Sequence, residues 1–192
     1  TAGRVADFFL LLTGDKKNYT LALSGDNLPP GFDTSKIALI NLVSDKKNMG
    51  SSGAVAVETK GLNFIPDVPG GAYDQAALTS LPGSPVLSSE KGAASGGTAN
   101  GTITQTQTSP RDFSFNYTLQ DDDDFVFSQM GWGFFDAAGV FRGTPQNLGS
   151  SVVLAVNGPA GKKLKVEVVD TAGRVADFFL LLTGDKKNNT LA

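Results

Sequence analysis

Cysteine and histidine are absent from this 192-residue chain. Without cysteine there is no thiol nucleophile and no thiolate metal ligand. Without histidine there is no Ser-His-Asp triad and no imidazole acid–base or metal chemistry. The carboxylates that remain, such as Asp7, Glu58, Asp136 and Glu167, are not paired at a spacing typical of glycosidases. We therefore expect a protein that is not an enzyme and needs no cofactor, with Ca²⁺ as the one candidate ion.

Long apolar runs and basic clusters are also missing. No unbroken apolar run exceeds five residues, as at 8–12, which is too short to cross a membrane, and no signal-peptide pattern is visible. The net charge is −3, and the lysines and arginines form no basic cluster. We expect neither nucleic acid binding nor insertion into a membrane.

The sequence does contain alternation at a period of two. Phe113, Phe115 and Tyr117 alternate with polar residues, as do Leu164 and Val166, which predicts strands with one buried face. The 23 glycines and 40% hydrophobic residues are typical of an all-β chain with many turns. We predict an antiparallel, jelly-roll-like β-sandwich, with strands at residues 5–12, 19–23, 37–43, 53–59, 101–108, 112–119, 125–129, 151–157 and 164–168. Segment 5–12 is apolar on both faces, which predicts a central or covered strand.

Residues 1–22 recur at 171–192. The two copies agree at 21 of 22 positions and differ only at Tyr19 and Asn189. An identity this high at an offset of 170 indicates a tandem array with a unit of about 170 residues. The tetrapeptide Asp-Lys-Lys-Asn also recurs, at 15–18, 45–48 and 185–188, and we interpret all three occurrences as hairpin turns.

Composition divides the chain into three parts. Residues 66–99 are rich in Pro, Gly and Ser without strand alternation, which predicts a linker with one helical turn near 73–78. Residues 100–192 then form the first half of a sandwich module, and residues 1–65 form the second half. The module is therefore split across the repeat boundary.

Three stretches carry a resemblance to known sandwiches. They are LAVNGPAGKKLKVEVVDTAGRVADFFLLLTGDKKNYTLALSG, continued across the repeat junction, FDTSKIALINLV and GAVAVETKGL. Joined in that order, they resemble the galactose-binding-like and carbohydrate-binding-module β-sandwiches. Such domains serve as sugar-binding modules, spacers and adhesin domains, so the resemblance implies a fold and an extracellular or cell-surface location but leaves the role open.

Two motifs allow a functional or a structural interpretation. The run Asp121, Asp122, Asp123 and Asp124 has the oxygen ligands that Ca²⁺ prefers, but it lacks the Gly or Asn spacing of an ordered calcium loop, and we favour a solvated hairpin turn. Trp132, in Gly-Trp-Gly-Phe-Phe, is either an exposed platform for stacking on sugars or a core aromatic. Four sequons also mark candidate glycosylation sites, at Asn18, Asn100, Asn116 and Asn188.

The duplicated segment bears most directly on function, since two copies compete for one place in the fold. Tyr19 shares a face with Leu21 and Leu23, whereas Asn189 buries an amide poorly. We therefore expect residues 1–22 to dock and 171–192 to be the spare or intermolecular copy. The candidate inter-subunit strand residues are Val5, Phe8, Phe9, Leu10, Leu11, Leu12, Val175, Phe178, Phe179, Leu180, Leu181 and Leu182.

The expected function is that of a structural subunit. We expect an extracellular fibre, stalk or adhesin built from repeats of about 170 residues, joined head to tail with strand sharing between units, so that its main partner is itself. The alternative is a carbohydrate-binding module that anchors a larger protein and has glycans as partners.

Overall fold

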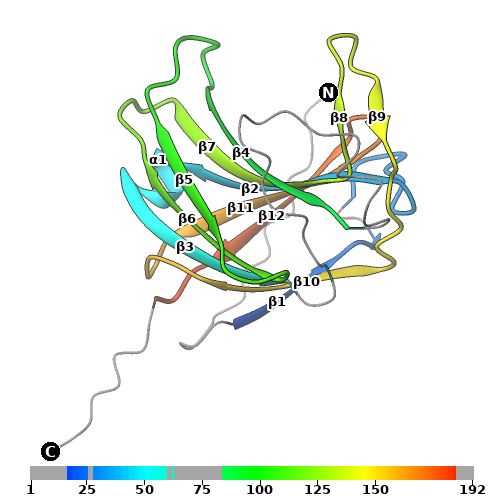
Figure 1. The fold of residues 1–192 in the computed structure, drawn as a ribbon, viewed down its shortest axis with the longest axis horizontal. Coiled ribbons are helices and arrows are strands. Elements are labelled where there is room, and N and C mark those ends of the chain that lie inside the picture. Colours follow the sequence, from blue (N-terminus) through cyan, green and yellow to red (C-terminus); the bar gives the residue numbers. More distant parts are fainter. Residues whose placement is uncertain (1–16, 26–27, 60–61, 63–83, 185–192) are drawn as a thin grey trace, which may run out of the picture.

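The computed structural model describes residues 17–25, 28–59, 62 and 84–184, and this part of the chain forms two antiparallel sheets packed face to face (Figure 1). Sheet A has the order β1 (Lys17–Ala22), β10 (Ser151–Asn157), β3 (Ser52–Thr59), β6 (Asp112–Thr118) and β5 (Thr102–Gln107). Sheet B has the order β12 (Val175–Leu181), β11 (Lys163–Asp170), β2 (Ile37–Asp45), β7 (Asp124–Gly131) and β4 (Val86–Ala93). A hairpin of β8 (Gly133–Phe135) and β9 (Phe141–Gly143) projects from one end.

Successive strands pass repeatedly from one sheet to the other. Strands β1 to β5 alternate between sheets A and B, and later β6 leads to β7 and β10 leads to β11 across the sandwich. This alternation confirms the predicted antiparallel β-sandwich of jelly-roll type. Each crossing buries apolar side chains from both sheets in one shared core.

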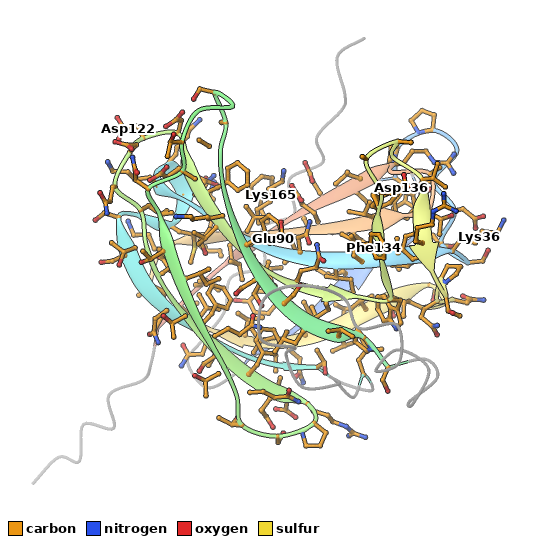
Figure 2. The ribbon with its side chains drawn as sticks, turned by 45° about the horizontal axis from the view of Figure 1, so that its top comes forward. Lys36, Glu90, Asp122, Phe134, Asp136 and Lys165 are labelled. Atoms are coloured by element: carbon orange, nitrogen blue, oxygen red, sulfur yellow. The ribbon has the colours of Figure 1, made fainter. Side chains whose placement is uncertain are left out.

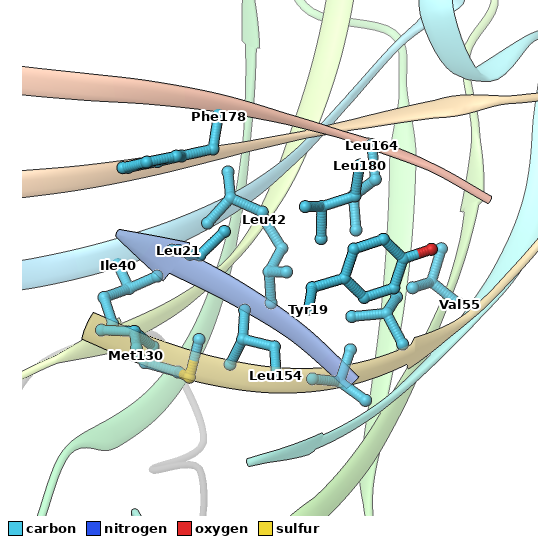
Figure 3. Close-up of a cluster of buried hydrophobic side chains, with 14 of the residues drawn as sticks. Tyr19, Leu21, Ile40, Leu42, Val55, Met130, Leu154, Leu164, Phe178 and Leu180 are labelled. Carbon is cyan, nitrogen blue, oxygen red and sulfur yellow. The ribbon is translucent and has the colours of Figure 1, made fainter. Parts of the chain in front are cut away.

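The core is filled by the inward positions of the alternating strands. Figure 3 shows Tyr19 and Leu21 of β1 among apolar side chains of both sheets, including Leu154, Phe178 and Leu180. All five are no more than 4% exposed. Burial of one such side chain contributes about 1.5–3 kcal/mol, so β1 and β12 add substantially to the stability of the sandwich.

The turns between β2 and β3 and between β6 and β7 are not hairpin turns, contrary to the prediction, because each joins strands of different sheets. In the first turn, Asp45 caps the short helix α1 (Lys46–Met49). Its Oδ1 accepts a hydrogen bond from the Asn48 backbone N–H at 2.9 Å, and its Oδ2 accepts one from Asn48 Nδ2 at 2.7 Å. In the other Asp-Lys-Lys-Asn sequences, residues 15–16 and 185–188 lie outside the described residues, and Lys17 and Asn18 begin β1.

The predicted linker at 66–99 contains a strand. Strand β4 pairs with β7 along its whole length, from Val86 opposite Gly131 to Ala93 opposite Asp124. Only its first two residues, Val86 and Leu87, are apolar and buried, and Glu90 and Lys91 are exposed, so it has no apolar alternation and is defined mainly by backbone pairing. The remainder of the predicted linker that precedes β4, including 73–78, lies outside the described residues apart from residues 84 and 85.

Segment 5–12, for which we predict a central or covered strand, lies outside the described residues. Its copy, β12, is not central: β12 is an edge strand of sheet B, as β1 is of sheet A, and the two lie on the same side of the sandwich (Figure 1). In β12 the inward residues Phe178 and Leu180 are buried, whereas the outward residues Phe179 and Leu181 are half-buried. The second apolar face is therefore the outer face of an edge strand.

Candidate functional site at the edge shared by the two copies

The two copies of the repeated segment each supply a different strand. Strand β12, Val175–Leu181, belongs to the last copy, and β1, Lys17–Ala22, belongs to the first. The two strands come from different parts of the repeated segment, so the two copies together supply each of its two strands once. The prediction that residues 171–192 would be the spare copy is wrong for 171–184. The first copy's Val5, Phe8, Phe9, Leu10, Leu11 and Leu12 lie outside the described residues.

The last copy is held by the residue that precedes it. Asp170 is fully buried, and its Oδ1 accepts hydrogen bonds from the backbone N–H groups of Ala172 at 2.9 Å and Arg174 at 3.0 Å. Its Oδ2 accepts from Arg174 Nε at 2.7 Å and from the Asp33 backbone N–H at 3.0 Å. Gly173 has φ +75°, which a glycine adopts without strain. This turn sends the chain back from β11 into β12.

The same turn pattern occurs in the β8–β9 hairpin. Asp136 Oδ1 accepts from the Ala138 and Val140 backbone N–H groups at 3.0 and 2.9 Å, and Oδ2 accepts from Arg142 Nε at 2.9 Å. The Val140 N–H and then Arg142 lower the pKa of Asp136. Asp136 is only partly buried, whereas Asp170 is inaccessible to solvent and also bonds to a distant loop. The turn before β12 is therefore the more firmly anchored of the two.

The first copy is held by the residues that follow it. Strand β1 pairs with β10 over its six residues, from Lys17 opposite Val156 to Ala22 opposite Ser151. Leu23 continues this pairing, because its N–H donates to the Ser150 carbonyl at 2.8 Å and its side chain is 3% exposed. The anchoring contacts of β1 therefore extend past the end of the strand.

Tyr19 joins the two copies directly. Its ring is 1% exposed, and its hydroxyl donates a hydrogen bond to the Leu181 carbonyl of β12 at 2.9 Å. Burial raises the pKa of Tyr19 to about 12. A small cavity of about 60 Å³ lies beside this contact, lined by Tyr19, Thr20, Leu21, Ala22, Phe178, Phe179 and Leu180.

The end of β12 and the start of β1 lie against the same turn. Leu182 exchanges backbone hydrogen bonds with the β10–β11 turn, donating to Lys162 and accepting from Gly161, both at 2.7 Å. Gly184 lies beside Ala160 in this turn, and Lys17 pairs with Val156 of β10. In the repeated sequence only two residues, Asp185 and Lys186, separate Gly184 from the equivalent of Lys17. The junction of the repeat is therefore short in sequence and local in space.

The four aspartates do not gather into a calcium site. Among the residues that the structure describes, no group of three or more carboxylates is arranged to hold a metal ion. Asp121 accepts from Asn100 Nδ2 at 2.7 Å, Asp122 pairs with Lys46 at 2.8 Å, and Asp123 accepts from the Ser95 hydroxyl. Asp124 is 1% exposed and accepts from backbone N–H groups of the same turn. These side chains therefore organise a turn, in which Figure 2 labels Asp122.

Trp132 is a core residue and not a platform for sugars. It is 2% exposed, and its backbone N–H donates to the Ala38 carbonyl at 3.0 Å. The next residue, Gly133, lies so close to β9 that a Cβ there would collide with the Arg142 carbonyl oxygen. The flanking glycine thus allows the hairpin to leave the core while Trp132 stays inside.

The sequons occupy different positions. Asn18 and Asn116 are exposed on strands of sheet A, and Asn100 is exposed although its side-chain amide bonds to Asp121. Asn188 lies outside the described residues.

A polar row on the outer face of sheet B was not predicted. Asn41 Nδ2 donates to Glu167 Oε2 at 3.1 Å, and Gln129 Nε2 donates to Asn41 Oδ1 at 3.0 Å. Lys165, which Figure 2 labels, has its Nζ 2.7 Å from Glu167 and 3.1 Å from Asp177. Burial raises the pKa of Asp177, and although burial opposes the charge of Lys165, its bond to Glu167 keeps the pKa of that lysine raised. The signal in the sequence was the polar residues within these strands, such as Asn41 in β2 and Asp177 in β12.

Comparison with protein-family models, curated proteins and solved structures found no match. In the described part of the chain, no helix has the length and apolar character needed to cross a membrane.

Proposed function

We propose that this chain is a unit of a tandem array that forms an extracellular fibre, stalk or adhesin. The observation that carries the proposal is that the two copies of the repeated segment supply different strands of the sandwich. One copy provides β12, the other provides β1, and the two strands lie at neighbouring edges of one sandwich. Each sandwich needs one β1 strand and one β12 strand. An array with a repeat of 170 residues supplies one of each strand per unit.

Successive units would be joined through the backbone. The chain provides both edge strands itself, so the sandwich needs no strand from a neighbour. In a longer array, β12 is followed after the five residues 182–186 by the next β1, and both ends of this connection lie near the β10–β11 turn. We infer that the repeated segment stays within one sandwich and that the residues before β4 connect one sandwich to the next.

The alternative, a carbohydrate-binding module, rests on the resemblance in sequence. Its designated platform, Trp132, is buried, and we therefore favour the structural role.

The proposal is tested with proteins of one, two and three consecutive repeats. We expect a regular increase in particle length by electron microscopy and by small-angle scattering, with the same unfolding midpoint for each added unit. A collapsed multimer without a regular increment, or loss of cooperative unfolding when a repeat is added, would contradict the array. Binding to an affinity gel of an insoluble polysaccharide, if found, would support the alternative.

A further inference from the structure

We propose that the polar row on the outer face of sheet B is a site of covalent self-modification: the side chain of Lys165 on β11 forms an amide with the side chain of Asp177 on β12, and Glu167 carries the proton. The reactants are a primary amine and a carboxyl group of the same chain. The product is a cross-link that fixes the edge strand β12 to β11. The inference holds whether or not the chain belongs to an array.

The two reacting groups are in contact. Lys165 Nζ lies 3.1 Å from Asp177 Oδ2. Asp177 is opposite Glu167 in the register of the two strands, and Lys165 is two residues from Glu167, so Lys165 and Asp177 are diagonal neighbours on one face of the sheet. Groups held this close react at effective concentrations far above those of free reactants in solution. The fold therefore supplies the close approach that the reaction needs.

The surroundings of the pair disfavour its charged form. The cross-strand partners of Lys165 are Val43, which is 8% exposed, and Phe179, which is half-buried. Burial raises the pKa of Asp177, so its carboxyl group takes up a proton more readily than an ordinary aspartate. Burial opposes the charge of Lys165 while its bond to Glu167 raises its pKa, so the ion pair is the resting state. Transfer of one proton from Nζ to Asp177 Oδ2 gives a neutral amine beside a neutral carboxyl group, which is the reactive state.

Asp177 also has an oxygen that the fold leaves without a hydrogen bond. Its Oδ1 is buried and has no hydrogen-bond partner in the described part of the chain. Such an oxygen is more costly to bury on a charged carboxylate than on a neutral carbonyl group. In the amide, Nζ takes the place of Oδ2 and Oδ1 becomes the carbonyl oxygen. The reaction therefore lowers the cost of burying this side chain.

Glu167 is held where it can move the proton. Its Oε1 is 2.7 Å from Lys165 Nζ, and its Oε2 accepts a hydrogen bond from Asn41 Nδ2 at 3.1 Å. The Asn41 amide is fixed in turn by Gln129, whose Nε2 donates to Asn41 Oδ1 at 3.0 Å. Asn41 and Gln129 are 9% and 7% exposed. The row thus keeps one oxygen of Glu167 on the amine, which gives these buried amides a role that strand pairing does not require.

The reaction is a condensation that releases one water molecule. The lone pair of the neutral Nζ attacks Cγ of Asp177, which forms the C–N bond and a tetrahedral intermediate. Glu167 Oε1 accepts the second proton of Nζ and returns it to the hydroxyl group formed from Oδ2. The Cγ–Oδ2 bond then breaks with its electron pair, water leaves, and Glu167 is again a carboxylate. The balance needs no oxidant, reductant or co-reactant.

Mass spectrometry of the purified full chain tests the proposal. We expect the intact mass to be lower than that of the sequence by the mass of one water molecule. Trypsin does not cut after an acylated lysine, so residues 164–174 should remain one peptide, joined to the peptide that begins at Val175. Fragmentation of this joined peptide should place the bond between Lys165 and Asp177.

Three variants show which side chains the bond needs. Lys165→Arg keeps the positive charge beside Glu167 and Asp177 but has no amine, and we expect it to keep its full mass. Glu167→Gln keeps the size of the side chain but cannot carry the proton. We expect less than about a tenth of its chains to be linked when the unaltered chain is fully linked. Lys163→Arg is the matched control, because Lys163 lies on the same strand and face, and it should lose water as the unaltered chain does.

Three results would overturn the proposal. The first is an unaltered chain that is folded by circular dichroism and keeps its full mass on prolonged incubation at neutral pH. The second is a loss of water that persists in Lys165→Arg or that maps within a single tryptic peptide, as in ring closure of an aspartate on its own backbone. The third is complete linkage in Glu167→Gln, which would remove the proton carrier from the reaction.

Discussion

The two copies of the 22-residue segment have nearly the same sequence, but the sandwich takes a different strand from each. The last copy gives β12, which follows Asp170 and its buried hydrogen bonds. The first copy gives β1, which leads into Leu23 and the core. In the described residues, the two copies are distinguished by the residues that flank them and by the side chain of Tyr19.

The largest expected effect comes from the flank of the last copy. Asp170→Ala removes the carboxylate that accepts hydrogen bonds from Ala172, Arg174 and Asp33, so these donors lose their acceptor. We expect the free energy of unfolding in urea to fall by about 3 kcal/mol. The matched control is Asp136→Ala, which breaks the same turn pattern in an exposed hairpin. Equal losses in the two variants would refute the special role of the Asp170 flank.

The contact between the copies should have the next largest effect. Tyr19→Phe keeps the buried ring and removes the hydroxyl that bonds to Leu181. We expect a loss of about 1 kcal/mol in the free energy of unfolding, measured by urea denaturation. Tyr117→Phe removes a comparable bond to Met49 and should cost a similar amount. An unchanged stability in Tyr19→Phe would mean that the bond between copies contributes nothing.

The dependence of stability on alkaline pH should report on the same two tyrosines. Burial raises the pKa of Tyr19 and of Tyr117 to about 12 from an ordinary value of 10.0. Between pH 10 and 12 the unfolded chain loses these protons first, so stability is complete below pH 10 and falls as pH rises through the folded pKa. Each Phe variant should flatten part of this decline in urea denaturation series. If neither variant changes the fall in stability between pH 10 and 12, the fall is caused by other groups.

The smallest effect should follow removal of the last copy beyond β12. Deletion of residues 185–192 leaves Leu182 and Gly184 at the β10–β11 turn. We expect the free energy of unfolding to change by less than about 0.5 kcal/mol, as for changes away from the core. A loss comparable with that of Asp170→Ala would show that β1 is not held by the first copy alone.

The sequence predicts strands well where one face is buried. Strand β10 has the predicted bounds, and β6 and β11 follow the alternation of large apolar residues. Strand β4 escapes prediction because its residues after Leu87 are polar, glycine or alanine, and a strand held mainly by backbone pairing leaves no apolar signature.

The site is less predictable because it depends on distant contacts. From the sequence alone, Asp170 is an ordinary turn residue, because its hydrogen bond to Asp33 joins residues that are 137 positions apart in the chain. Trp132 illustrates the same limit, since an aromatic beside glycines has the same sequence whether it faces the core or the solvent. The choice between the two copies could be partly anticipated from Tyr19, but the contribution of the flanks could not.

The edge position of β1 and β12 has a mechanical consequence. A force applied to a single chain through Lys17 and Gly184 acts at neighbouring points beside one turn, and it would peel each edge strand from its partner one hydrogen bond at a time. In the proposed array a two-residue connection joins these points within one sandwich. Tension would then enter at β4, the other edge strand of sheet B, and would leave β1 and β12 unloaded. Single-molecule stretching should therefore find that an internal unit of the array opens at β4, whereas the isolated chain pulled from its ends opens at β1 and β12.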